Sequence, residues 1–471
     1  MLRDREVSAT EVMQAHLTRT ASLNSQLNAI VTLVADLALA KAKEADTALL
    51  RGDHVGPLHG LPVAHKDLFL TKGLRTTFGS PIFKSFVPDQ NSIIVERLQS
   101  AGAISIGKTN TSEFGAGSQT FNTVFGPTRN PWNLEKTCGG SSGGSAVALA
   151  TGMVCLADGT DMGGSIRNPA SFCNVVGLRP SPGQVPVWPN RTAWFPSPSV
   201  AGPMARTVAD VKLMLEAIVG ADRRDPLSFD DSNAVASMSL DRDLTDIRIA
   251  WSQNLGGLPV DPAVTTVIEQ HRSTFEQLGC ITEDATPDLS DADEIFRTWR
   301  AWYYELEYGT LLESHRPQLK DTVIWNIEAG QRLSGVQLGD MARRHAQLHH
   351  RMNNFMDTYE FLVLPVTQVT PFDINKPYVT EINGTKMTNY LDWMRSCYYI
   401  SATGLPAISV PSGFTSDGLP VGIQIVSRHR QDIKLLQLAH AFEQATEFWR
   451  RRPPIVAAIK DNDTAAADSQ C

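Results

Sequence analysis

Three serines stand out because they lie in two short clusters of glycine and serine. Ser141 and Ser142 belong to the first cluster, residues 139–145, and Ser165 ends the second, residues 163–165. Glycine allows several backbone N–H groups to converge on one point, so a serine in such a loop lies beside an anion site. Acyl transfer needs that kind of site for the oxyanion that forms on the attacked carbonyl. The two clusters therefore predict a serine nucleophile that attacks a carbonyl group.

A serine hydroxyl is a poor nucleophile until a base removes its proton. Upstream of the clusters, residues 60–67 read GLPVAHKD, and the apolar part predicts a buried strand that ends at Lys66. A lysine at such a position is commonly a surface residue whose stem lies along apolar groups.

Two other interpretations of the glycine clusters compete with this one. A flexible Gly/Ser linker is disfavoured, because patterned apolar segments flank the clusters and charged residues, Asp161 and Arg167, accompany the second. Ser141 and Ser142 also match G-x-S-x-G, the nucleophile elbow of α/β-hydrolases, which requires a strand immediately before the serine. Residues 133–138 make a poor strand, and the elbow leaves Ser165 unexplained. An esterase of that type remains the second enzyme hypothesis.

Helical and strand patterns alternate along the chain around these motifs. Ser8 to Glu11 form a capping box that opens a helix, and residues 208–219 and 264–278 are expected to be helices. This alternation predicts an α/β fold with a large mixed, mostly parallel sheet covered by helices on both faces. We expect a single domain over residues 1–456, followed by a disordered tail at 457–471.

Composition restricts the partners. The chain is 42% hydrophobic and 20% charged, with a formal net charge of −8 and no basic patch, which predicts no nucleic-acid partner. No apolar run of 18 residues and no signal peptide are evident, so a cytoplasmic protein without membrane contact is expected. The six cysteines are scattered. His345 and His349 are spaced as a metal pair would be, but a solvated helix face is favoured, and neither metal nor cofactor is expected.

Several segments together resemble the amidase signature family. They read GGSSGGSA, GTDMGGSIRNPASFCNVVGLRPS, GLPVAHKD, GPMARTVADV and GLPAISVPSGFTSDGLPVGIQIV. The resemblance covers about 56–220 and 361–445, which would form the catalytic core, and is weak over the mainly helical 221–360. Two residues depart from the common pattern: His65 stands where an apolar residue is usual, and Cys138 where proline is frequent.

The resemblance implies an α/β/α fold and a Ser-cisSer-Lys triad. Ser165 would be the nucleophile, Ser141 the proton relay after a cis peptide, and Lys66 the base. The backbone N–H groups of four consecutive residues would form the oxyanion hole: Met162, Gly163, Gly164 and Ser165. Ser142 would hold the lysine, and Asp161 and Arg167 would brace the loop, unless they form a simple surface ion pair.

The expected activity is hydrolysis of an amide C–N bond, by a monomer or homodimer. We call residues 221–360, where the family resemblance is weak, the family-poor segment. Aromatic residues are frequent in it and shortly after it; they are Trp299, Trp302, Tyr303, Tyr304, Tyr308, Trp325, Trp393, Tyr398 and Tyr399. Most are expected in the core, but a few facing the cleft would favour a bulky, neutral aryl amide, anilide or carbamate, with side activity on esters. The alternative is the related subunit of a tRNA-dependent amidotransferase.

Overall fold

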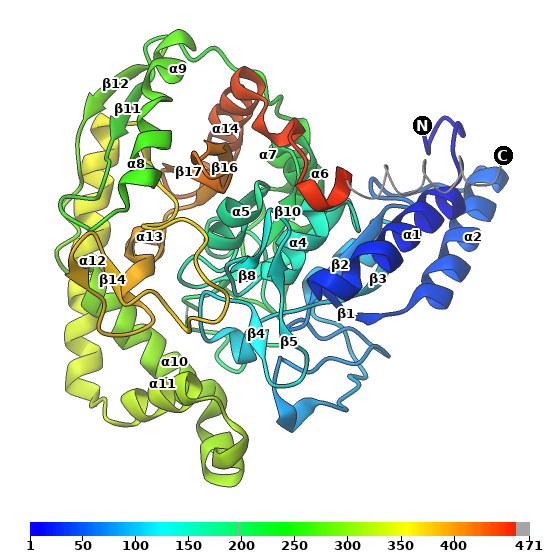
Figure 1. Ribbon diagram of the computed structural model, residues 1–471, viewed down its shortest axis with the longest axis horizontal. Helices are drawn as coiled ribbons and strands as arrows, with labels where there is room; N and C mark the ends of the chain where they lie inside the picture. The colour runs from blue at the N-terminus through cyan, green and yellow to red at the C-terminus, as the bar shows by residue number, and fades with distance from the viewer. Residues whose placement is uncertain (196, 458–471) are drawn as a thin grey trace.

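A single large sheet forms the centre of the molecule (Figure 1). The computed structural model describes residues 1–195 and 197–457, and the sheet has eleven strands within them. In spatial order these are β1 (Ile30–Leu33), β3 (Ile104–Thr109), β2 (Pro62–Lys66), β8 (Leu156–Asp161), β10 (Val200–Ala205), β9 (Val176–Arg179), β16 (Ala407–Phe414), β17 (Pro420–Ser427), β13 (Phe361–Pro365), β11 (Arg248–Trp251) and β12 (Ile281–Asp284).

The predicted mixed sheet is confirmed, but the expectation that it is mostly parallel is wrong. Within the described residues, six of the ten strand pairings are antiparallel. Parallel pairs occur toward the two ends, in β3–β2–β8 and β13–β11–β12, while the strands between them run antiparallel. The physical reason is visible at β16 and β17, which are joined by a short turn that can connect only antiparallel neighbours.

Helices cover both faces of the sheet (Figure 1). The helices are α1 (Ala9–Leu27), α2 (Ala35–Arg51), α3 (Ile93–Ser100), α4 (Gly143–Ala150), α5 (Arg167–Cys173), α6 (Val208–Ile218), α7 (Ser232–Ser237), α8 (Pro262–Glu269), α9 (Arg272–Gln277), α10 (Ala292–His315), α11 (Asp321–Gln331), α12 (Gly335–Thr358), α13 (Arg395–Thr403) and α14 (Asp432–Thr446). Helices α6, α8 and α14 pack on one face, and α4, α5 and α13 on the other.

Strand β13 shows how the sequence serves two cores at once. Phe361 and Val363 belong to the apolar cluster on the α6–α8–α14 face, whereas Leu362 and Leu364 belong to the cluster on the opposite face. Successive side chains of a strand point to opposite faces, so a continuous apolar run is what a strand buried on both sides requires.

The local sequence signals were largely correct. Ser8 caps α1 in the predicted capping box with Glu11, and Thr207 caps α6. The single helix expected over 264–278 is two helices, α8 and α9, which are separated at Gln270 and His271. The family-poor segment is mainly helical as predicted, and it also supplies β11 and β12 to the edge of the main sheet.

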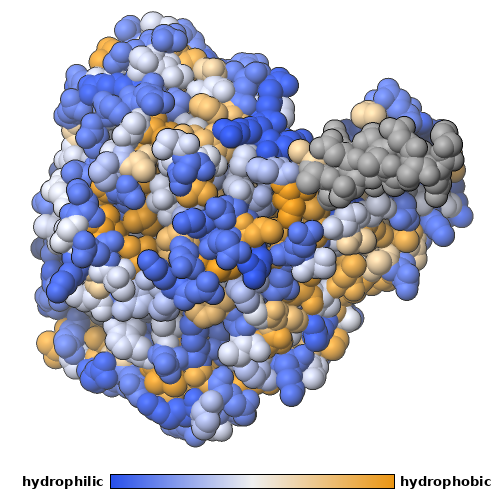
Figure 2. All heavy atoms as spheres, viewed as in Figure 1, coloured by the Kyte–Doolittle hydropathy of each residue, from blue (hydrophilic) through white to orange (hydrophobic). Residues whose placement is uncertain are grey.

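The helices α10, α11 and α12 lie at the opposite end of the molecule from α1 and α2 (Figure 1). On the face seen in Figure 2, hydrophilic and hydrophobic residues are interspersed. None of the helices in the described residues is both long and apolar enough to span a bilayer. The expected disorder at 457–471 concerns residues that, apart from 457, lie outside the described part of the chain.

Candidate active site

Lys66, the last residue of β2, is fully buried and faces two serines. Its Nζ donates hydrogen bonds to Ser141 Oγ at 2.7 Å, to Ser142 Oγ at 2.8 Å and to Thr160 Oγ1 at 2.8 Å. Burial lowers the pKa of Lys66 to about 7, against the attraction of the Asp161 and Asp158 carboxylates. With a pKa of about 7, about half of the Lys66 amines are neutral at pH 7. The neutral form can accept a proton from a serine.

The first glycine cluster presents Ser141 through an unusual backbone. The Gly140–Ser141 peptide is cis, as the family resemblance implied, and α4 begins two residues later at Gly143. Ser118 Oγ donates to the carbonyl oxygen of Gly140 at 2.8 Å, and Asn168 Nδ2 donates to Ser118 Oγ at 2.6 Å. These buried polar contacts fix the peptide that carries Ser141.

The second cluster forms the turn between β8 and α5. Gly164 has φ of 110°, which a residue with a side chain rarely adopts. The Asp161 carboxylate accepts hydrogen bonds from the N–H groups of Gly164 at 2.9 Å and Ile166 at 3.2 Å. The N–H of Ser142 donates to the carbonyl oxygen of Ser165 at 3.0 Å, so the two clusters are directly joined.

The turn leaves three of the four predicted oxyanion-hole donors available. In the part of the chain that the structure describes, the N–H groups of Met162, Gly163 and Ser165 make no hydrogen bond. The N–H of Gly164 is instead engaged by Asp161. Its assignment to the hole is therefore corrected: this N–H holds the turn in shape, and the other three can serve an incoming oxygen.

Asp161 and Arg167 are not a surface ion pair, because both side chains are fully buried. Arg167 Nη2 lies 2.8 Å from Asp161 Oδ1 and Arg167 Nε lies 3.0 Å from Oδ2. A second guanidinium lies nearby, with Arg179 Nη1 3.4 Å from Asp161 Oδ1. Although burial acts to raise it, these two cations lower the pKa of Asp161. The carboxylate therefore stays charged and holds the turn that precedes the nucleophile candidate.

Sequence reasoning missed two groups around the lysine. Thr160 on β8 accepts from Lys66 Nζ, and Asp158 on the same strand accepts from the Lys66 N–H at 2.6 Å. Asp158 also contacts His65 Nδ1 at 2.6 Å, while His65 Nε2 contacts Ser105 Oγ at 2.7 Å. These contacts explain why a histidine can replace the usual apolar residue at position 65, because its ring links β2 to β8 and to β3. The GTD triplet before the second cluster was the signal that could have found Thr160.

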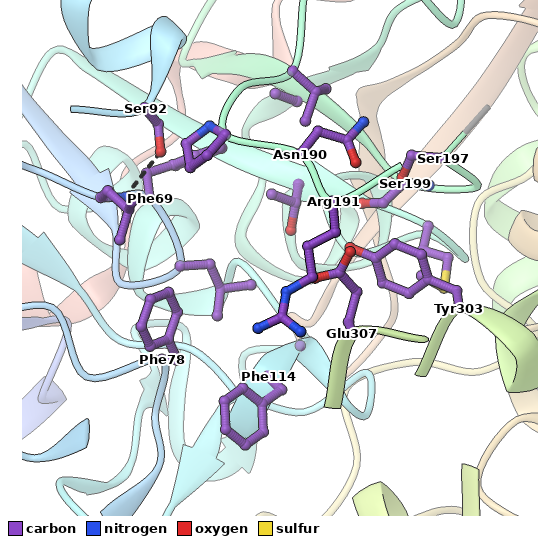
Figure 3. A pocket seen from close by; sticks show the side chains of 18 of the residues that line it. Phe69, Phe78, Ser92, Phe114, Asn190, Arg191, Ser197, Ser199, Tyr303 and Glu307 are labelled. Atoms are coloured by element: carbon purple, nitrogen blue, oxygen red, sulfur yellow. Dashed lines mark hydrogen bonds and ion pairs between the residues drawn. The ribbon is translucent and has the colours of Figure 1, made fainter. Parts of the chain in front are cut away.

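Ser141 and Ser165 both line a cavity of about 520 Å³, together with Thr160 and Met162. Phenylalanine and tyrosine rings form much of its wall; they are Phe69, Phe78, Phe83, Phe86, Phe114, Tyr303, Tyr304 and Tyr308. In Figure 3, Phe78 and Phe114 lie on one side of the cavity and Tyr303 on the other. The volume and the apolar wall are typical of a small-molecule site.

Two arginines give this cavity polar groups. Arg191 extends across it in Figure 3, with Nε 3.7 Å from Glu307 Oε2, and is mostly exposed. Arg300 is buried and contacts the Tyr390 hydroxyl at 2.9 Å and Met162 Sδ at 3.0 Å. The cavity therefore has two cations that the sequence analysis did not anticipate, Arg191 exposed and Arg300 buried. No cluster of three or more possible metal ligands is found in the described residues.

The nine aromatic residues singled out in the sequence lie in different surroundings. Tyr303, Tyr304 and Tyr308 line the cavity that contains Ser165. Trp393 and Tyr398 are buried in the core, and Trp325 is 41% exposed. Trp299 and Trp302 line a second, neighbouring cavity. Tyr399 is partly buried, and only Tyr304, Trp393 and Tyr398 of the nine are buried. The expectation that most of them are core is therefore wrong, whereas a few do face the cavity as expected.

Known proteins resemble this chain over nearly its whole length. The family model described as Amidase matches residues 11–436. The chain belongs to the amidase family. It is 36% identical over 455 residues to an acylamidase of Rhodococcus erythropolis, which covers 95% of this chain and 94% of that protein. It is 34% identical over 476 residues to a glutamyl-tRNA(Gln) amidotransferase subunit of Methylococcus capsulatus, with 97% of each covered.

Solved structures of amidases agree with the fold. A bacterial aryl acylamidase of the amidase signature family superposes with a TM-score of 0.88 at 28% identity, covering 97% of this chain and 96% of that one. A 6-aminohexanoate cyclic dimer hydrolase complexed with substrate gives 0.87 at 25% identity, with 97% of each chain covered. The family resemblance predicted from the motifs is confirmed, and this protein is an amidase-family hydrolase of amides.

The α/β-hydrolase alternative does not hold. Residues 133–137 do form a strand, β7, so that sequence expectation was wrong, but β7 pairs with β6 (Arg129–Asn130) in a separate two-stranded ribbon. An elbow needs a strand of the main sheet. Ser141 and Ser142 also contact a lysine, whereas the nearby His65 contacts Ser105.

Proposed function

We propose that this amidase cleaves bulky, neutral aryl amides, anilides or N-aryl carbamates through Lys66, Ser141 and Ser165. The observation that carries the proposal is the contact of a buried lysine of lowered pKa with Ser141, at a cavity that Ser165 also lines. Neutral Lys66 takes the Ser141 proton while Ser141 takes that of Ser165, and Ser165 Oγ attacks the carbonyl carbon.

The oxyanion that forms on the carbonyl oxygen is stabilised by the N–H groups of Met162, Gly163 and Ser165. When the C–N bond breaks, the proton held by Lys66 returns through Ser141 to the departing amine. Water then attacks the acyl-enzyme by the same relay and releases the acid. With a carbamate the released carbonic monoester loses carbon dioxide. Aryl esters should also react, because an aryloxide leaves more easily than an amine.

A serine-reactive fluorophosphonate tests the nucleophile. We expect it to label Ser165, to abolish hydrolysis of acetanilide, and to leave Ser165→Ala unlabelled. Peptide mapping that placed the label on Ser141 or Ser142 would contradict the proposed roles. Thr192→Ala, which removes a hydroxyl from a residue outside the cavity lining, is the control and should keep labelling and activity.

A second candidate is the subunit of a tRNA-dependent amidotransferase, which the similarity to several glutamyl-tRNA(Gln) amidotransferase subunits favours. Those relatives differ little from the acylamidase in identity, so the discrimination must be biochemical. Glutamine hydrolysis by this chain that increases when the partner subunits of a relative are added would support this candidate. The aryl wall of the cavity favours the first one, because glutamine is small and polar.

A further inference from the structure

A second cavity of about 600 Å³ lies next to the cavity of Ser165. Met162 and Ser197 line both cavities. The two cavities therefore meet at Met162, one of the predicted oxyanion-hole residues. The sequence motifs assign no role to this second cavity, which we call the distal cavity. Its volume lies within the range of small-molecule sites, about 300–1,000 Å³.

Helix α10 lines both cavities. Ile295, Phe296, Trp299 and Trp302 line the distal cavity, whereas Arg300, Tyr303, Tyr304, Glu307, Tyr308 and Leu311 line the cavity of Ser165. Both sets repeat every three or four residues, the spacing of side chains on one face of a helix. A single helix therefore presents an aromatic surface to each cavity.

The far wall of the distal cavity comes from α12 and the end of α13. His345 on α12 contacts the Ala402 carbonyl oxygen through Nε2 at 2.8 Å. A carbonyl oxygen only accepts hydrogen bonds, so Nε2 carries the proton and Nδ1 is left as an acceptor in the neutral ring. Burial lowers the pKa of His345, which keeps the ring neutral near pH 7. The cavity thus offers aromatic surface and the imidazole of His345, together with the guanidinium of Arg179 and the rings of His349, His350 and His429.

We propose that the distal cavity binds a second aryl ring of an extended substrate whose scissile carbonyl lies at Ser165. Flat aromatic rings fit a wall built from Trp299, Trp302 and Phe296, because ring pairs gain dispersion and quadrupole energy beyond area burial. The guanidinium of Arg179 in the lining is already paired with Asp161 Oδ1 at 3.4 Å, so a neutral ring is favoured over an anionic one. This inference rests on the proposed function for the position of the carbonyl, but its binding test does not.

The test compares one-ring and two-ring substrates in matched variants. Acetanilide carries one ring, 4-benzylacetanilide a second ring on the amine side, and 4-phenylbutyranilide a second ring on the acyl side. Ala346→Trp fills the distal cavity from α12, and Gln347→Trp adds the same ring one residue further along, outside the lining. Trp302→Ala removes part of the aromatic wall from α10.

We expect Ala346→Trp and Trp302→Ala each to lower the ratio of kcat/KM for a two-ring substrate to that for acetanilide by about tenfold. Gln347→Trp should leave it unchanged. The substrate whose ratio falls identifies whether the amine or the acyl side enters the cavity. An unchanged ratio for both two-ring substrates in Ala346→Trp and Trp302→Ala would overturn the proposal.

Binding to Ser165→Ala separates this inference from the proposed function. When 4-benzylacetanilide and 4-phenylbutyranilide are each titrated and followed by tryptophan fluorescence, at least one of them should give a Kd about tenfold lower than that of acetanilide. Adding Ala346→Trp should remove the difference. If the unaltered enzyme hydrolyses no anilide but this difference is present, the proposed function fails and the distal site stands. Equal Kd values for acetanilide and both two-ring ligands would refute the site even if all three were hydrolysed.

Discussion

Lys66 and Lys108 show why burial alone does not make a catalytic lysine. Both are fully buried, and burial lowers the pKa of Lys108 to about 8, against the attraction of Asp67 and Asp158. Lys108 donates to Thr71 Oγ1 at 2.9 Å and Thr76 Oγ1 at 3.1 Å. Neither of those hydroxyls belongs to a residue that lines the cavity of Ser165. The distinguishing feature of Lys66 is its contact with Ser141.

The proposed base predicts a rising pH profile. The amine accepts a proton only when it is neutral, and with a pKa of about 7 its neutral fraction rises roughly tenfold between pH 6 and pH 8. We therefore expect kcat/KM for acetanilide to rise by about that factor over this range. A profile that is flat between pH 6 and pH 8 would show that Lys66 does not titrate as the base.

Replacing the lysine gives a second test. Lys66→Met keeps most of the buried stem but removes the amine, so hydrolysis should fall by roughly 10² to 10⁴-fold. Circular dichroism and the thermal midpoint should show a folded protein, because removal of a buried cation relieves its desolvation. Activity within a few-fold of the unaltered enzyme would exclude the proposed triad.

Asp158 on β8, the strand next to β2, should influence the pKa of Lys66. Its carboxylate raises the pKa of Lys66, so Asp158→Asn should shift the rising limb of the pH profile toward lower pH. The asparagine amide oxygen can still accept from the Lys66 N–H, and its NH₂ group can donate to His65. The measurement is kcat/KM against pH, with the exposed Asp53→Asn as control. A shift toward higher pH, or none, would show that Asp158 acts only as a structural partner.

At the scale of elements, the turn between β8 and α5 depends on a buried charge. Asp161 binds two guanidinium groups and three backbone N–H groups, so Asp161→Asn leaves Arg167 and Arg179 without this anion in the interior. Loss of one partner from a buried ion pair costs about 3–5 kcal/mol. Urea unfolding at pH 7 should show a loss of this size.

The exposed pair of Lys41 and Glu44 is the matched control. Glu44→Gln should change the free energy of unfolding by less than about 1 kcal/mol. The folded-state pKa of Asp161 is lowered, so its contribution is present above the unfolded pKa of about 3.9 and is lost as the pH falls through the folded value. Equal effects of the two substitutions at pH 7 would contradict a structural role for Asp161.

The sequence predicted the elements whose signals are local. The cap at Ser8, the apolar strand that ends at Lys66, and the glycine clusters each carry their own evidence in consecutive residues. Strand β7 was missed because its residues are polar, and its pairing with β6 lies outside the apolar sheet. Strand directions could not be read either, because they depend on which distant segments become neighbours.

The same limit applies to the site. Lys66, Ser141 and Ser165 could be singled out as candidates because each belongs to a motif of consecutive residues. Thr160 and Asp158 were missed because β8 comes beside β2 only through the parallel pairing of Val63 with Leu156. The engagement of the Gly164 N–H was likewise invisible, since it depends on where the Asp161 side chain turns.

At the scale of the whole molecule, substrate class follows from what the family-poor segment adds to the catalytic core. Helix α10 brings Tyr303, Tyr304 and Tyr308 to the cavity of Ser165, which favours an aryl substrate. It also brings Arg300, a buried cation whose contacts in the described residues are tyrosine hydroxyls and Met162 Sδ. A substrate oxygen could therefore gain a charge-assisted hydrogen bond there, and a small acid could compete.

The tyrosines of the cavity favour aryl substrates, whereas Arg300 favours small acids. A comparison of these two substrate classes therefore tests which residues set the specificity. We expect kcat/KM for acetanilide or an N-phenyl carbamate to exceed that for malonamate, acetamide and glutamine by at least tenfold, which is about 1.4 kcal/mol of transition-state preference. Tyr308→Ala should reduce the aryl substrates more than acetamide, because it removes a ring from the wall. Arg300→Met should reduce malonamate more than acetanilide, if the guanidinium reaches the carboxylate. A tenfold preference for the small polar substrates would mean that Arg300, and not the tyrosines, sets the specificity of this amidase.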